Sequence, residues 1–137
     1  MQIVYQLQLN QKFIDQVQKA TLTTKEFGLQ PTHGLFGSPE WWENIKAGKL
    51  QMHTVRGVIE QVYMGSQNDW PMCEVLSDDG EKSRWTREVQ DFSLDSLYRV
   101  GARIEIDYVF QKSKADATWK PGAEQKNVLE IRIKSKT

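Results

Sequence analysis

The chain has 137 residues, of which 39% are hydrophobic and 26% charged, a composition typical of a soluble globular protein of one domain. Its 18 basic and 18 acidic side chains cancel, which excludes the strongly basic surface that most simply indicates a nucleic-acid-binding protein. The charges are unevenly placed, because residues 51–100 hold five basic and nine acidic side chains, whereas residues 101–137 hold eight and five. An anion-binding surface is therefore expected in the last third of the chain.

The compartment follows from cysteine usage and hydropathy. Cys73 is the single cysteine, so no disulfide can form within the chain. The N-terminus carries no apolar signal segment, and no apolar run is long enough to cross a bilayer. These features predict a cytoplasmic protein that does not enter a membrane.

The first fifty residues are predicted to contain a strand and two helices. Residues 2–9 carry apolar side chains at alternate positions, which is typical of a half-buried strand, although Val4 leaves a helical interpretation open. Asn10 is a suitable N-cap for a helix near residues 11–20.

A second helix is predicted near residues 39–47. Ser38 is a favourable N-cap, and Pro39 stands at the first helical position, where its missing N–H has no helical partner to lose. Gly48 is the left-handed residue that ends the helix. The helix is too short to persist alone, so we expect its apolar side, led by Trp42, to pack on the rest of the domain.

Five β-rich segments follow, punctuated by glycines and polar loops. They are residues 53–65, 71–77, 81–87, 100–111 and 127–134. Five short strands in this order, with a glycine inside the first and a tight turn between the second and third, resemble an OB-fold barrel. The resemblance implies an α+β, mainly β fold: a five-stranded antiparallel OB-like barrel over residues 51–135, with residues 1–50 packed on it as an α/β extension of a single domain, 1–137.

The facing of the strands is predicted from their alternation. The Asp-Gly pair at residues 79–80 is typical of a two-residue type I′ turn, which would set Glu74 opposite Trp85. We expect the small Cys73 to face the barrel interior, which places Trp85 and Arg87 on the outer face; the opposite assignment remains open.

In the last two strands the alternation is clearer. Even-numbered positions from Ala102 to Phe110, and odd-numbered positions from Leu129 to Ile133, are expected to face the core. Gly57 in the first strand predicts a bulge or a sharp bend.

OB folds commonly bind ligands between two loops and the outer face of the second and third strands. One of these loops carries a tryptophan before Pro71 and the other a tryptophan among lysines. Aromatic rings stack on bases and cationic side chains follow the phosphates. The binding residues predicted on this basis are Trp70, Trp85, Arg87, Lys112, Lys114, Trp119, Lys120 and Lys126. A Trp-Pro pair is also common at a packing corner, and a lysine-rich loop is often only solvated.

The residue pattern indicates neither catalysis nor metal binding. The carboxylates around the turn at residues 78–81 lack the spacing of a calcium loop, and the two histidines and Cys73 are too scattered for a metal site. Phosphate-binding, dinucleotide and nucleophile motifs are absent. We therefore expect a binding module with no cofactor and no metal, and not an enzyme.

Two functions remain open. The favoured one is binding of single-stranded nucleic acid in the OB-like cleft, which the strand order and the loop tryptophans support and the zero net charge opposes. The alternative is a protein-interaction module, of the inhibitor or immunity type, that uses a Trp-rich surface on a protein partner. Five tryptophans in a neutral chain favour this alternative, since exposed tryptophan and arginine are common binding hot spots.

Overall fold

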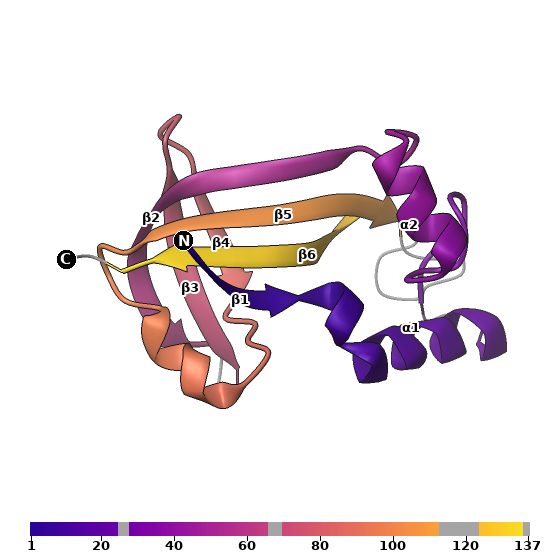
Figure 1. The fold of residues 1–137 in the computed structure, drawn as a ribbon, viewed down its shortest axis with the longest axis horizontal. Coiled ribbons are helices and arrows are strands. Elements are labelled where there is room, and N and C mark those ends of the chain that lie inside the picture. The colour runs from indigo at the N-terminus through magenta and orange to yellow at the C-terminus, as the bar shows by residue number, and fades with distance from the viewer. Residues whose placement is uncertain (25–27, 66–69, 113–123, 136–137) are drawn as a thin grey trace. The chain divides into compact units, whose positions relative to one another are not determined.

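The computed structural model has an α+β, mainly β fold (Figure 1). It describes residues 1–24, 28–65, 70–112 and 124–135. The chain divides into two compact units, and their boundaries fall within long strands. The first unit consists of Met1–Gln6, Thr54–Asp107 and Glu130–Thr137, and the second of Leu7–His53 and Tyr108–Leu129. The single domain expected from the sequence stays a prediction.

Six strands form the sheet. They are β1 (Gln2–Gln6), β2 (Met52–Met64), β3 (Pro71–Ser77), β4 (Lys82–Thr86), β5 (Arg103–Lys112) and β6 (Glu124–Lys134). Their order is β1-β6-β5-β2-β3-β4, and β1 pairs with β6, β2 with β3, and β3 with β4 in antiparallel register. Over the residues described, the sheet is open, with β1 and β4 at its edges. The predicted five-stranded barrel is therefore wrong, because the N-terminal strand, assigned to the extension, takes the place beside β6.

The helical elements are η1 (Leu7–Leu9), α1 (Gln11–Thr23), α2 (Pro39–Lys46) and η3 (Phe92–Leu97). The two α-helices lie where the sequence predicts them. The Asn10 side chain accepts a hydrogen bond from the Phe13 N–H, and Ser38 accepts one from the Trp41 N–H. Gly48, just after α2, has a φ of 78°, as expected of a helix-ending glycine.

The N-terminal strand is shorter than predicted and is interrupted. The pairing register of β1 shifts between Ile3 and Tyr5, and Val4 and Tyr5 are both buried whereas Ile3 is 46% exposed. A bulge adds one residue to a strand and breaks its period of two. The alternation predicted for residues 2–9 would place Ile3 and Tyr5 on the same buried side, whereas the structure buries Val4 and Tyr5 and leaves Ile3 exposed.

The β3–β4 hairpin turns through three residues instead of two. The Ser77 N–H donates to the Glu81 carbonyl at 2.8 Å, the Gly80 N–H donates to the Ser77 carbonyl at 2.9 Å, and Gly80 has a φ of 91°. This is a type I turn followed by a left-handed glycine. The extra loop residue sets Cys73 opposite Trp85, and a slip of one position moves a side chain to the other face of the sheet.

The outward placement of Trp85 is consequently wrong, while the inward placement of Cys73 is confirmed. Trp85 is 4% exposed and Cys73 is fully buried. Burial raises the pKa of the Cys73 thiol to about 12, so this thiol stays protonated at neutral pH. The core of the first unit consists of Val4, Tyr5, Ile59, Cys73, Val75, Trp85, Tyr98, Ala102, Ile104, Ile106, Ile131 and Ile133.

Strand β5 changes its buried positions along its length. Ile106 is buried as predicted, but further along the strand Val109 and Gln111 are buried and Tyr108 and Phe110 are only partly so. Hydropathy alone places a glutamine outside. Here both ends of the Gln111 amide have partners within the second unit, so its burial leaves no polar atom unsatisfied.

One of those partners is Trp41 of α2, and the other is the Gln30 carbonyl. Trp41 is fully buried, and its indole N–H donates to Gln111 Oε1 at 3.1 Å. The Trp41 ring lies 4.8 Å from the Phe36 ring and 4.9 Å from the Trp42 ring, centroid to centroid. Trp42 is only partly buried. The apolar side of α2 is therefore led by Trp41, and not by Trp42 as the sequence suggested.

A network of charges covers the exposed face of the first unit's strands. Arg132 of β6 makes a two-point contact with the Asp107 carboxylate at 2.8 and 3.1 Å, and it also contacts Glu105 and Glu130. Burial alone would raise the pKa of Asp107, but hydrogen bonds from Arg132 and Thr54 hold it below its ordinary value. The outer members of the network are Gln6 of β1 and Thr54 and Arg56 of β2.

Strands β2 and β3 approach each other closely at Gly57. The bulge in β2 lies at residues 59–61, whereas Gly57 pairs regularly with Ser77, and a Cβ on Gly57 would lie 2.1 Å from the Leu76 carbonyl oxygen.

We expect Gly57→Ala to lower the free energy of unfolding by about 2–3 kcal/mol, because the strands must separate. Gly80→Ala is the control: it meets no atom within 4 Å and bears only the left-handed strain of about 1 kcal/mol. Equal losses in urea denaturation would contradict the steric explanation.

Candidate partner-binding surface

The β2–β3–β4 side of the first unit presents one face to the core and another outward. We call the second one the outer face. It consists of three rows set by the strand pairing: Val58, Leu76 and Lys82; Gln61, Glu74 and Arg84; and Tyr63, Met72 and Thr86. Aliphatic, aromatic and paired polar side chains thus alternate over a continuous sheet surface, a mixture typical of protein–protein interfaces.

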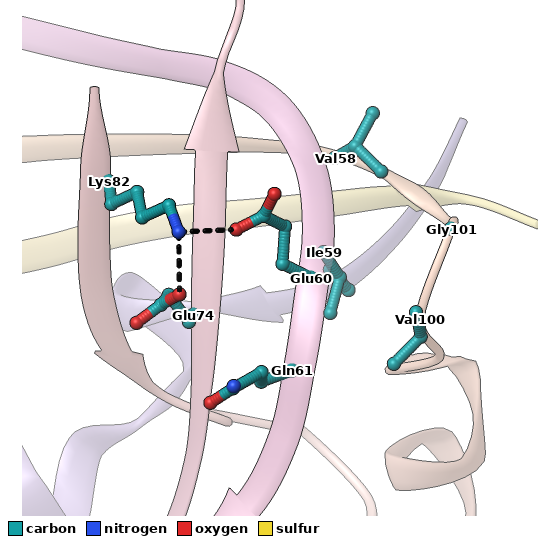
Figure 2. A pocket seen from close by; sticks show the side chains of 8 residues that line it. All are labelled: Val58, Ile59, Glu60, Gln61, Glu74, Lys82, Val100 and Gly101. Atoms are coloured by element: carbon teal, nitrogen blue, oxygen red, sulfur yellow. Dashed lines mark ion pairs between the residues drawn. The ribbon is translucent and has the colours of Figure 1, made fainter. Parts of the chain in front are cut away.

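A cavity of about 400 Å³ opens at one end of the outer face. Figure 2 shows Lys82 between two carboxylates: its Nζ lies 3.5 Å from Glu60 Oε2 and 4.0 Å from Glu74 Oε1. Glu60 is the extra residue of the β2 bulge, where the register shifts between Ile59 and Gln61. The lining residues are Val58, Ile59, Glu60, Gln61, Glu74, Lys82, Val100 and Gly101.

Arg87 ties together three segments at the opposite end of the outer face. Its Nη1 donates to the carbonyls of Tyr63 and Met72 at 2.8 and 2.7 Å, and its Nε donates to Asp95 of η3 at 3.1 Å. Only 9% of the Arg87 side chain is exposed. Its guanidinium therefore holds the local structure, and most of its donors are already engaged.

Trp70 lies directly before β3, one of the segments that Arg87 connects. It is 57% exposed, and its indole N–H donates to Thr86 Oγ1 at 3.0 Å, which fixes the ring at the end of the outer face. Met64 of β2 is 42% exposed and Phe92 of η3 is 82% exposed. We call Met64 and Trp70 the Trp70 corner, since the Gly65 N–H donates to the Trp70 carbonyl at 2.6 Å and joins their segments; its exposed apolar side chains suit a partner surface.

The residues predicted to bind a ligand are not one group in the structure. Trp70 is exposed, Trp85 is buried in the core, and Arg87 is engaged internally. Lys112 and Lys126 are exposed but belong to the second unit. Lys114, Trp119 and Lys120 lie outside the described residues. The binding roles of Trp70, Lys112 and Lys126 stay predictions.

The sequence reasoning missed the cavity and its charged residues. Glu60 is carried there by a bulge that was expected at Gly57, and the outer-face position of Arg84 depends on the three-residue turn. The charged residues Glu81, Lys82 and Arg84 were a sequence signal in this region, but they alone do not locate a surface.

The charge of the first unit is unfavourable for a nucleic acid. It contains nine basic and twelve acidic residues. Asp78, in the hairpin turn, pairs with Arg103 at 2.8 and 2.9 Å, and hydrogen bonding from Arg103 lowers the pKa of Asp78. Asp78 therefore stays ionised at neutral pH, and the excess of acidic residues in the first unit would repel phosphates.

Comparison with known families identifies the chain. The family model of the immunity protein RhsI2 matches residues 1–134. The chain belongs to the RhsI2 immunity protein family. A search of curated proteins finds no match.

Membership of the RhsI2 immunity family corrects the OB-fold interpretation. The match includes all six strands and both α-helices, whereas the OB resemblance rested on the order of five strands only. It supports the alternative function, an immunity-type protein that acts on a protein partner, over single-stranded nucleic-acid binding. Among the described residues of this RhsI2-family chain, no helix is long and apolar enough to span a membrane, and no cluster of three metal-binding side chains occurs.

Proposed function

We propose that this immunity protein binds a toxin and blocks it without catalysis, using the outer face and the Trp70 corner as its binding surface. The observation that carries the proposal is the family match over residues 1–134. The cytoplasm, where a toxin would meet its target in the producing cell, is the compartment that we propose.

The surface has the properties that such a complex requires. An exposed tryptophan on a rigid support loses little conformational freedom on binding and buries a large area, which is why tryptophan is enriched among hot spots. The Thr86 hydrogen bond and the Arg87 contacts hold this corner in place before any partner arrives. Preorganisation of this kind favours affinity because less is lost when the complex forms.

Co-expression tests the proposed function. A cognate toxin domain should arrest growth when it is expressed alone and should be neutralised when this chain is present. The purified pair should form a complex that buries roughly 1,600 Å² or more in total, and toxin–immunity pairs include some of the tightest complexes known. Growth arrest that persists despite abundant folded protein would refute the proposal.

Trp70→Ala should weaken the complex by about 2 kcal/mol, roughly a 30-fold rise in Kd, since it removes the exposed aromatic side chain of the Trp70 corner. The measurement is isothermal titration of the toxin domain. Leu22→Ala is the matched control, because Leu22 is an equally apolar side chain, 71% exposed, on α1 of the second unit. A Trp70→Ala variant that binds like the wild type would remove the Trp70 corner from the interface.

A further inference from the structure

We propose that the cavity beside Glu60 and Glu74 receives an arginine side chain of the toxin, which displaces Lys82 from between the two carboxylates. This inference rests on the proposed function and names the chemistry of one contact in it. Three features of the cavity carry it: under-used carboxylates, aliphatic walls that are held in place, and a weakly bound ammonium.

The two carboxylates have unused bonding capacity. Each ionised carboxylate can accept about four hydrogen bonds, yet within the described part of the chain the contacts of Glu60 and Glu74 are ion pairs with Lys82 at 3.5 and 4.0 Å. Only 16% of the Glu74 side chain is exposed. A carboxylate removed from water to this extent gains from a donor that reaches it, since charge-assisted hydrogen bonds are about twice as strong as neutral ones.

The walls of the cavity suit the stem of a long basic side chain. Val58 and Val100 line it together with the carboxylates, and Figure 2 shows Val100 beside Gly101 on the segment that approaches β2. Two hydrogen bonds hold this segment: Gly101 donates to the Ile59 carbonyl at 2.8 Å, and Ile59 donates to the Ala102 carbonyl at 3.0 Å. An aliphatic stem can pack on such walls while its charged end reaches the carboxylates.

Lys82 is held weakly enough for an arginine side chain to displace it from the two carboxylates. Its side chain is 64% exposed, and its distances to the two carboxylates exceed the 2.7–2.9 Å of a good charge-assisted hydrogen bond. An exposed lysine at such long distances contributes little to stability through its ion pairs, so Lys82 can move into water. The cavity then presents two negative charges, and the planar guanidinium fork of arginine can bond both carboxylates at once, which an ammonium does less well.

The test uses the full chain and a small probe. N-acetylarginine amide should shift the backbone amide signals of Glu60, Glu74 and Gly101 in an NMR titration, with a Kd on the order of millimolar for a ligand of this size. N-acetylcitrulline amide, which has nearly the same shape without the charge, should bind at least tenfold more weakly. Equal shifts from the two probes, or no shift at these residues, would overturn the proposal.

Two variants give opposite expected results. Lys82→Met removes the competing ammonium and should tighten arginine binding about threefold to tenfold, whereas Glu74→Gln should weaken it at least fivefold. Glu60→Gln provides a second variant of the same kind. Tighter binding by Glu74→Gln, or weaker binding by Lys82→Met, would contradict the displacement of Lys82.

The same variants separate this inference from the proposed function. If the wild-type chain neutralises the toxin but Glu74→Gln and Glu60→Gln leave the Kd for the toxin unchanged, the arginine contact is refuted and the proposed function stands. If the wild-type chain neutralises no toxin, the proposed function fails, although the arginine probe still reports on the cavity. A rise of at least tenfold in the toxin Kd for Glu74→Gln supports both.

Discussion

Trp41→Ala should lower the free energy of unfolding by about 3–5 kcal/mol, the largest effect of any single substitution that we expect in the second unit. The ring is fully buried and contacts Phe36 and Trp42. Its loss opens a cavity and also leaves Gln111 Oε1 without its indole donor, and a buried acceptor without a partner adds its own penalty. Denaturation in urea, followed by near-UV circular dichroism, measures the loss.

A double-mutant cycle separates the cavity from the lost hydrogen bond. Trp41→Phe retains most of the ring packing but removes the N–H, and Gln111→Met removes the acceptor at similar size. The coupling between these two changes should be about 1 kcal/mol. If Trp41→Ala destabilises the protein by less than about 1 kcal/mol, the packing described for α2 is wrong.

Arg132→Met should cost about 3 kcal/mol at pH 7, because it leaves the clustered carboxylates of Glu105, Asp107 and Glu130 without their shared cation. Arg132 is partly exposed, at 20% of its side chain, so we expect the lower end of the range for broken buried ion pairs. Lys134→Met, two residues along the same strand, is exposed and should change the stability by less than about 0.5 kcal/mol.

The effect of Arg132→Met should depend on pH. The pKa of Asp107 is lowered in the folded chain, so its contribution to stability is present above its unfolded pKa of about 3.9 and is lost as the pH falls through the lower folded pKa. The wild type should therefore lose stability below about pH 4, and the difference between wild type and Arg132→Met should narrow there. Unfolding free energies at pH 7 and pH 3 test this; an equal difference at both would contradict the role of Asp107.

Local chemistry allowed much of the fold to be predicted. The helices follow from their caps, Asn10 and Ser38, and β6 follows from the alternation of Leu129, Ile131 and Ile133, all of which are buried. These features depend on residues that are near one another in sequence. Whether the sheet closes into a barrel could not be predicted in this way, because it depends on which strands, far apart in the sequence, pair with each other. No local pattern indicated that the N-terminal strand would pair with β6.

The candidate site was harder to predict from the sequence. One extra residue in a turn or a strand decides which side chains reach it. One extra residue in the β3–β4 turn puts Trp85 in the core, and one bulge in β2 brings Glu60 to the cavity. A shift of one position reverses the face of a side chain. Trp70 could be placed in a loop from the sequence because its position did not depend on the register of either strand; its binding role stays a prediction.

Among the residues that the structure describes, β4 is an edge strand of the sheet, and this has a consequence for how copies of the chain meet each other. An uncovered edge strand is a template to which another chain can add, and proteins limit this with short strands and charged residues. β4 has five residues, and Lys82 and Arg84 among them are exposed. At the high local concentrations of a freshly translated protein, these two cations would set like charges beside each other in an antiparallel pairing of two β4 strands, and so disfavour self-assembly.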